Sequence, residues 1–138
     1  MKAFITLNPH IENLSKNNLI KTFRYILQKY YRGKLGARYS KHKDKQYKIC
    51  VFPENGSRDF KQPHLHIIIQ IPCDELEEFY FFIASNMNGY YPSLTTNCQV
   101  INNTEKDFVN VLGYCLKEQG EFLVNDDLFE RDLSLIHI

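Results

Sequence analysis

The sequence predicts an α+β domain built on a central antiparallel sheet with its helices on one face. Segments 46–53 and 64–71 have strand-like patterns and flank the turn residues Asn55-Gly56, so together they predict a hairpin. Residues 11–31 instead repeat apolar side chains at helical spacing. A chain of 138 residues is long enough for one domain with its own core.

The first strand is predicted over residues 2–8, which are apolar and β-prone and end at Asn8-Pro9. The helix predicted over 11–31 ends before Gly33 and Gly36, and a basic loop follows it. One face of this helix carries Leu14, Leu19, Ile20, Phe23, Ile26, Leu27 and Tyr30.

Later in the chain a helix is predicted over 74–87 with Asp74 as its N-cap, then a strand over 94–101 and a third helix over 105–118. The order β-α-β-β-α-β-α is that of ferredoxin-like or RRM-like folds, which leave one sheet face free to hold a site. Residues 1–120 are expected to form this domain, and 121–138 an acidic C-terminal tail.

Charge is distributed unevenly along the chain. Residues 1–62 carry 14 Lys and Arg against 4 Asp and Glu, whereas residues 63–138 carry 3 against 12. In segment 29–48 the basic residues alternate with tyrosines, and cations with stackable rings suit a nucleic-acid strand. The same pattern is also compatible with a solvated charged loop.

The sequence gives no sign of a membrane or secreted protein. No run approaches the ~20 apolar residues of a membrane helix, and the N-terminal apolar stretch is too short for a signal peptide. The cysteines Cys50, Cys73, Cys98 and Cys115 form no C-x-x-C pair, so free and mostly buried thiols are expected. A cytoplasmic or nuclear location follows as an expectation.

Two histidines stand one residue apart in "PHLHIII". On a strand, His64 and His66 point to the same face, where two imidazoles can share a metal ion. A surface pair bonded to carboxylates is the alternative. Glu54 ends the preceding strand and is the best third ligand; Asp59 and Glu12 are weaker ones. A mixed nitrogen and oxygen set with open positions favours Mn²⁺ or Mg²⁺.

A tyrosine and a lysine lie three residues apart in the predicted third helix. Tyr114 and Lys117 are therefore neighbours on one helix face. A nearby ammonium favours the ionised form of a phenol, which a tyrosine nucleophile needs because its unperturbed pKa is near ~10. Taken alone, a half-buried tyrosine beside a solvated lysine explains the spacing as well.

Together these motifs resemble the HUH endonucleases, and above all the small Rep proteins that initiate rolling-circle replication. "FITLNP" resembles their F-T-L-N motif through Phe4, Thr6, Leu7 and Asn8 with Ile5 inserted, "PHLH" resembles the metal-ligand motif, and "YCLK" resembles Y-x-x-K. The resemblance spans residues 4–117. The third motif of this chain contains a single tyrosine. The chain has no G-x-x-x-x-G-K-[ST] motif, with which a helicase domain would bind a nucleoside triphosphate.

The resemblance implies metal-dependent, sequence-specific nicking and joining of single-stranded DNA, with a single strand or an origin hairpin as the substrate. It makes Tyr114 the nucleophile, Lys117 its partner or a phosphate contact, and His64, His66 and Glu54 the ligands of a divalent cation, Mn²⁺ or Mg²⁺. A separate helicase and a host polymerase are the implied partners. The residues expected to contact DNA are Asn8, Lys2, Arg32, Lys34, Arg38, Tyr39, Lys41, Lys43, Arg58 and Lys61, with Tyr39 and Tyr47 as stacking platforms.

Two other functions are compatible with the same residues. A single-tyrosine HUH transposase or relaxase would perform the same reaction in another biological setting. A non-catalytic RRM-like module would bind single-stranded nucleic acid without any requirement for metal or for Tyr114.

Overall fold

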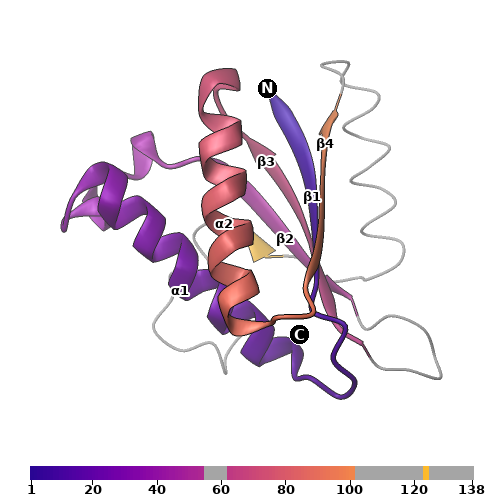
Figure 1. Ribbon diagram of the computed structural model, residues 1–138. Coiled ribbons are helices and arrows are strands. Elements are labelled where there is room, and N and C mark those ends of the chain that lie inside the picture. The colour runs from indigo at the N-terminus through magenta and orange to yellow at the C-terminus, as the bar shows by residue number, and fades with distance from the viewer. Residues whose placement is uncertain (55–61, 102–122, 125–138) are drawn as a thin grey trace.

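The computed structural model describes residues 1–54, 62–101 and 123–124 (Figure 1). Its elements follow in the order β1 (Lys2–Asn8), α1 (Lys16–Leu35), the 3-10 helices η1 (Tyr39–Lys41) and η2 (Lys43–Lys45), β2 (Lys48–Glu54), β3 (His64–Gln70), the 3-10 helix η3 (Cys73–Glu75), α2 (Leu76–Tyr90), β4 (Thr95–Ile101) and β5 (Leu123–Val124).

The strands form one sheet in the order β4-β1-β3-β2-β5, and every pairing is antiparallel. The first four strands and the two helices have the arrangement of a ferredoxin-like or RRM-like fold, so the predicted fold class is confirmed. Strand β5 extends the sheet beyond β2, where Val124 pairs with Cys50. It comes from the segment to which the sequence assigned only an acidic tail.

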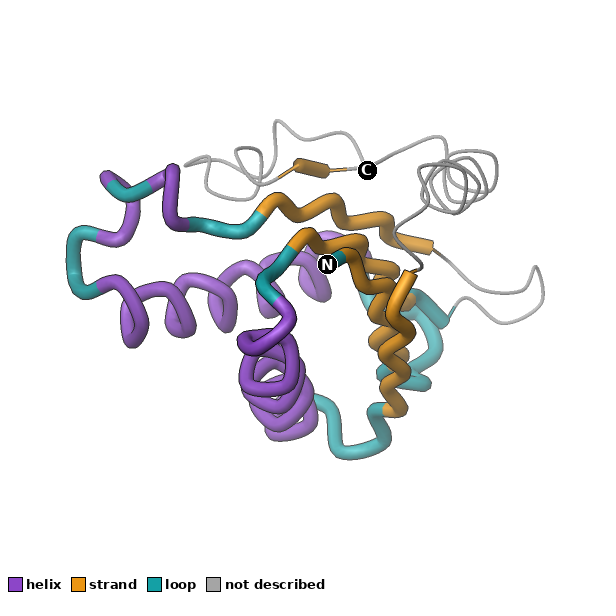
Figure 2. The backbone as a smooth tube through the Cα atoms, turned by 90° about the horizontal axis from the view of Figure 1, so that it is seen from above, coloured by secondary structure: helices purple, strands orange, loops and turns teal. Residues whose placement is uncertain are grey.

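Both helices cover the same face of the sheet, as Figure 2 shows from above. The core forms between them because alternate strand residues point to that face. On β1 these are Ala3, Ile5 and Leu7, each at most 1% exposed, and on β3 they include Leu65 and Ile67 at 0%. Helix α1 contributes Leu19, Ile20, Phe23, Ile26, Leu27, Tyr30 and Tyr31, and α2 contributes Phe79, Ile83 and Met87.

A polar network fixes the junction of α1, β2 and η3. The buried Tyr47 donates its hydroxyl to Glu75 Oε1 at 2.8 Å, and Lys34 forms an ion pair with the same oxygen. The Tyr30 hydroxyl lies 3.1 Å from that of Tyr47. Burial, together with these hydrogen bonds, raises the pKa of Tyr47 far above its usual range. Tyr47 therefore stays protonated and remains a donor to Glu75.

The ends of α1 differ from the predicted ones. The helix begins at Lys16 because the Ser15 hydroxyl accepts a hydrogen bond from the Asn18 amide, and it continues to Leu35 before Gly36 at φ 90°. Residues 11–15 are therefore not helical, and Arg32 and Lys34 belong to the helix rather than to a loop. The rest of the predicted basic loop contains η1 and η2.

The start of α2 also differs from the prediction. Asp74 lies inside η3 and α2 begins at Leu76, so Asp74 is not the N-cap of that helix. Cys50, Cys73 and Cys98 are free thiols, as expected, but none of the three is fully buried: Cys50 and Cys98 are half-buried and Cys73 is exposed. Cys115 and the predicted third helix lie outside the described residues. Within the described part of the chain, no helix has the length and apolar character needed to cross a membrane.

Phe79 tests the packing of the two helices. It is 0% exposed and meets the rings of Tyr30 and Tyr47 edge-on, so Phe79→Ala should cost about 3–5 kcal/mol of unfolding free energy. Phe81, on the same helix, is 61% exposed, and Phe81→Ala should change stability by less than about 0.5 kcal/mol. Urea unfolding of both variants measures the difference, and equal losses would contradict the assigned core.

Candidate metal site on the sheet face opposite the helices

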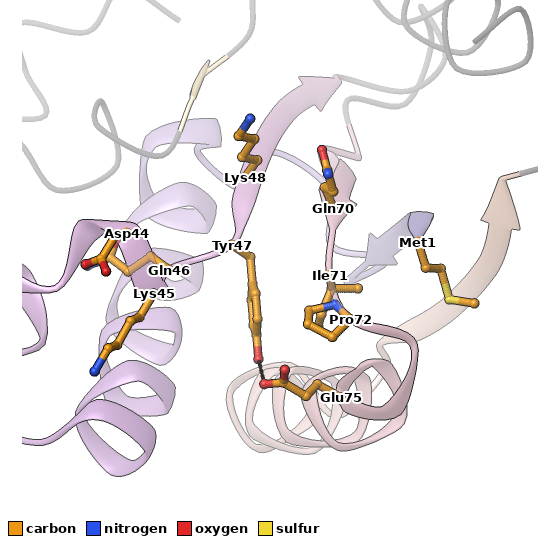
Figure 3. A pocket seen from close by; sticks show the side chains of 10 residues that line it. All are labelled: Met1, Asp44, Lys45, Gln46, Tyr47, Lys48, Gln70, Ile71, Pro72 and Glu75. Atoms are coloured by element: carbon orange, nitrogen blue, oxygen red, sulfur yellow. Dashed lines mark hydrogen bonds between the residues drawn. The ribbon is translucent and has the colours of Figure 1, made fainter. Parts of the chain in front are cut away.

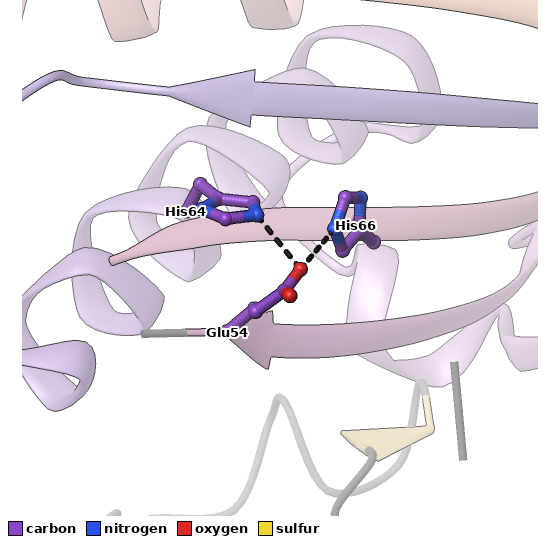
Figure 4. Close-up of side chains that lie close together, drawn as sticks. All are labelled: Glu54, His64 and His66. Atoms are coloured by element: carbon purple, nitrogen blue, oxygen red, sulfur yellow. Dashed lines mark hydrogen bonds and ion pairs between the residues drawn. The ribbon is translucent and has the colours of Figure 1, made fainter. Parts of the chain in front are cut away.

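Three side chains converge on the face of the sheet opposite the helices. Glu54 is the last residue of β2 and lies directly across from His64, the first residue of β3. His66 follows two residues later and so points to the same face. Figure 4 shows both imidazoles directed at the Glu54 carboxylate.

The ligand atoms lie close together. Glu54 Oε2 is 2.8 Å from His64 Nε2 and 2.6 Å from His66 Nε2. The three side chains are 13–23% exposed, so the cluster is half-buried yet reachable from solvent. These three residues are a set that could hold a metal ion.

The far nitrogen of each ring has a partner that fixes the orientation of the ring. His64 Nδ1 lies 3.3 Å from the Gln62 carbonyl oxygen, and His66 Nδ1 lies 3.2 Å from the Thr6 hydroxyl. Phe4 stacks on the His66 ring with centroids 5.2 Å apart. Such contacts to the nitrogen that does not bind metal are typical of metal-ligating histidines.

These contacts determine where protons can sit. A carbonyl oxygen only accepts, so His64 Nδ1 carries the hydrogen, and in the neutral ring Nε2 presents a lone pair toward Glu54. A lone pair facing a carboxylate oxygen at 2.8 Å is stable only if a proton or a metal cation lies between them. The site is therefore suited to a positive ion.

The electrostatics favour a charged carboxylate beside a neutral imidazole. Burial alone would raise the pKa of Glu54, but the His66 hydrogen bond and the electrostatic interactions with both rings outweigh it and lower that pKa. Burial lowers the pKa of His66, and the Glu54 hydrogen bond opposes this only in part. Two imidazole nitrogens and one carboxylate oxygen form a set that could hold a divalent metal ion.

The structure separates the basic segment from this cluster. Lys48 begins β2 and Glu54 ends it, so the segment before Lys48 lies about 20 Å from the cluster along the strand. It borders a pocket of about 370 Å³ at the other end of the sheet, lined among others by Lys45, Tyr47 and Gln70 (Figure 3).

Most residues predicted to contact DNA lie at that distant end. Lys2 pairs with Gln70 there, Lys34 is paired with Glu75, and Arg32 lies over the Tyr39 ring at 6.0 Å. Arg38, Lys41 and Lys43 lie in or beside η1 and η2, in the same segment. Asn8 alone among the described candidates shares the end of the sheet that carries His64.

Several predicted residues cannot be placed. Tyr114, Lys117, Arg58, Lys61 and Asp59 lie outside the described residues. Glu12 is exposed and does not belong to the cluster. Sequence reasoning missed Thr6 as a partner of His66, although Thr6 was already part of a motif; the strand register that joins them is a tertiary feature.

Comparison with known proteins does not identify the chain. No protein-family model matches it, and no curated protein matches it. Among solved structures, it is similar to the crystal structure of the hypothetical protein ORF119 from Sulfolobus islandicus rod-shaped virus 1, with 14% sequence identity and a TM-score of 0.48. That match covers 85% of this chain and 81% of the viral protein.

Thr6 offers a test of the cluster as a metal site. Titration calorimetry should show Mn²⁺ binding to the wild type, and Thr6→Val should weaken it about 10- to 100-fold because His66 loses its orienting partner. The control is Thr96→Val, which removes a hydroxyl bonded to Tyr80 on the neighbouring strand β4. Equal affinity in wild type and Thr6→Val, or an equal loss in Thr96→Val, would contradict the assignment.

His66 should make the metal-free protein less stable in acid. Its pKa in the folded state lies below the usual 6.5, so the unfolded chain binds more protons as the pH falls through that value. The stabilisation is present above about pH 6.5 and is lost below it. Urea unfolding in EDTA between about pH 7.5 and 5.5 should therefore show a smaller slope of stability with pH for His66→Gln than for wild type, and an equal slope would contradict this role of His66.

Proposed function

We propose that this chain is a metal-dependent, sequence-specific nickase and strand transferase for single-stranded DNA, of the HUH type that initiates rolling-circle replication. The observation that carries the proposal is the Glu54, His64 and His66 cluster on the face of an RRM-like sheet opposite its helices. The three side chains are 13–23% exposed, so a phosphate of a single strand could reach a cation held between them.

The cluster would bind a divalent cation through His64 Nε2, His66 Nε2 and Glu54. When bound, such a cation supplies positive charge to an oxygen of the scissile phosphate. Thr6 and Gln62 would keep both rings oriented for this task through their Nδ1 contacts. Phe4, stacked on His66, would shield one side of the site from water.

Tyr114 is the proposed nucleophile, on the motif resemblance alone. Its hydroxyl oxygen would bond to phosphorus while the bond from phosphorus to the 3′ oxygen breaks. The phenolic proton leaves to solvent or a base, and the departing oxygen takes up a proton to become a free 3′-OH. The protein then holds the 5′ phosphate as a phosphotyrosine. Attack by a 3′-OH on this linkage reverses the step and joins strands.

The nicking reaction can be tested with labelled single-stranded oligonucleotides that tile the replicon of origin, with Mn²⁺ or with EDTA. Wild type should produce a nick and a covalent protein–DNA adduct only with Mn²⁺. Tyr114→Phe should form no adduct, because the nucleophilic oxygen is gone, and Glu54→Gln should reduce nicking at least about 10-fold through loss of metal affinity.

Tyr90→Phe is the matched control, since Tyr90 is 55% exposed on α2 and belongs to none of the motifs. It should nick as the wild type does. DNA binding without cleavage on any oligonucleotide, unchanged by EDTA, would reject the nickase and support the RRM-like binding module. Persistence of the adduct in Tyr114→Phe would reject this nucleophile.

A further inference from the structure

The backbone just after β1 adopts an unusual conformation. His10 has φ 58°, in the left-handed region where residues other than glycine are uncommon and carry an energetic cost. Where only a turn is required, glycine or asparagine adopts this conformation more cheaply. Histidine is among the residues enriched in this region, so the backbone conformation alone assigns His10 no role, and the contacts of its ring must be considered.

Three hydrogen bonds hold His10 in place. The Asn8 side-chain oxygen accepts from the His10 amide at 2.9 Å, and the Ser93 hydroxyl donates to the Pro9 carbonyl oxygen. The ring itself is fixed by Thr95, whose hydroxyl lies 2.7 Å from His10 Nε2. Backbone and ring are thus both anchored, although His10 is an exposed residue.

The register places this ring at the same end of the sheet as the metal cluster. Thr95 pairs with Asn8 across β4 and β1, and Thr6 pairs with His66 across β1 and β3. Asn8 follows Leu7, which pairs with Leu65, so Asn8 lies near His64 on the face opposite the helices. Strands lie about 4.8 Å apart, so Thr95 is about 10 Å from His64, with one strand between them.

We infer that His10 binds a phosphate of the DNA strand on one side of the scissile position, an inference that rests on the proposed function. Nε2 is bonded to Thr95, and Nδ1 of this exposed ring has no hydrogen-bond partner among the described residues. An N–H directed at a phosphate oxygen fixes the position of a strand without reading its sequence. His10 is the contacting residue.

Asn8 takes a different role from the one that the motif resemblance implies. Its side-chain oxygen accepts a hydrogen bond from the His10 amide. Asn8 therefore positions His10 for the DNA contact and does not use this oxygen to contact DNA itself. Asn8 is therefore a positioning residue of this subsite.

The test compares His10→Asn and His10→Gly with wild type. Both variants tolerate the left-handed backbone and both remove the imidazole. Asn13→Gly is the matched control, because Asn13 is exposed, has φ 60° and lies in the same loop. The probe is a single-stranded DNA pool of about 20 randomised nucleotides, longer than the site of one such domain. Its dissociation constant is measured in EDTA, and Mn²⁺ affinity is measured separately.

Both His10 variants should bind the pool about 10-fold more weakly than wild type, the effect of losing one hydrogen bond to a charged group. Their Mn²⁺ affinity should stay within about twofold of wild type, and Asn13→Gly should match wild type in both assays. Wild-type DNA affinity in either His10 variant would overturn the contact. An equal loss in Asn13→Gly, or a parallel loss of Mn²⁺ affinity, would show that the loop is only structural and would also overturn it.

The same preparations separate this inference from the proposed function. A wild type that binds the pool through His10 but never nicks DNA would reject the nickase and retain the contact. A wild type that nicks DNA, with His10 variants that bind and nick equally well, would reject the contact and retain the nickase. A wild type that binds no single-stranded DNA would overturn both.

Discussion

The register of β3 against its two neighbours is the constraint on which the rest of the structure depends. Leu65 and Ile67 point to the helices and are fully buried, so His64 and His66 must point to the opposite face. A slip of one residue would place both imidazoles in the core and both apolar side chains in solvent. Burial of each apolar side chain stabilises the correct register by about 2 kcal/mol. The hydrophobic core thus sets the geometry of the polar site.

The two ends of the sheet differ in the polar contacts of their side chains. At one end the Tyr47 hydroxyl, Glu75 and Lys34 form a satisfied network that joins α1, β2 and η3. At the other end two imidazole nitrogens and a carboxylate oxygen face one another. Their lone pairs repel unless a proton or a metal cation lies between them. A network with every partner in place rigidifies a fold, whereas a cluster that needs an added ion is suited to binding. This contrast distinguishes the structural end from the candidate functional end.

Local patterns were sufficient to predict the strands, the shared face of the histidines and Glu54 as their partner, because alternation and turn residues operate over a few positions. They could not predict β5, a two-residue strand whose pairing with β2 is a long-range contact. The start of α1 at Lys16 was also not predicted. Apolar spacing extends the helix to residue 11, past the Ser15 cap at which it begins in the structure. The left-handed backbone at His10 depends on Thr95 and Ser93, 85 and 83 residues away along the chain, so no local pattern marks it.

Apolar side chains beside the cluster, on the sheet face opposite the helices, affect the protonation of His66. Phe52 and Ile68 lie on that face and are 0% and 3% exposed, and Phe4 covers one side of His66. A surrounding with few polar atoms disfavours an imidazolium, which accounts for the lowered pKa of His66. It leaves the neutral ring, the form that binds a metal ion, as the prevailing one near neutral pH. The apolar side chains that flank the cluster therefore disfavour a proton on His66 and leave its ring nitrogen available to a metal ion.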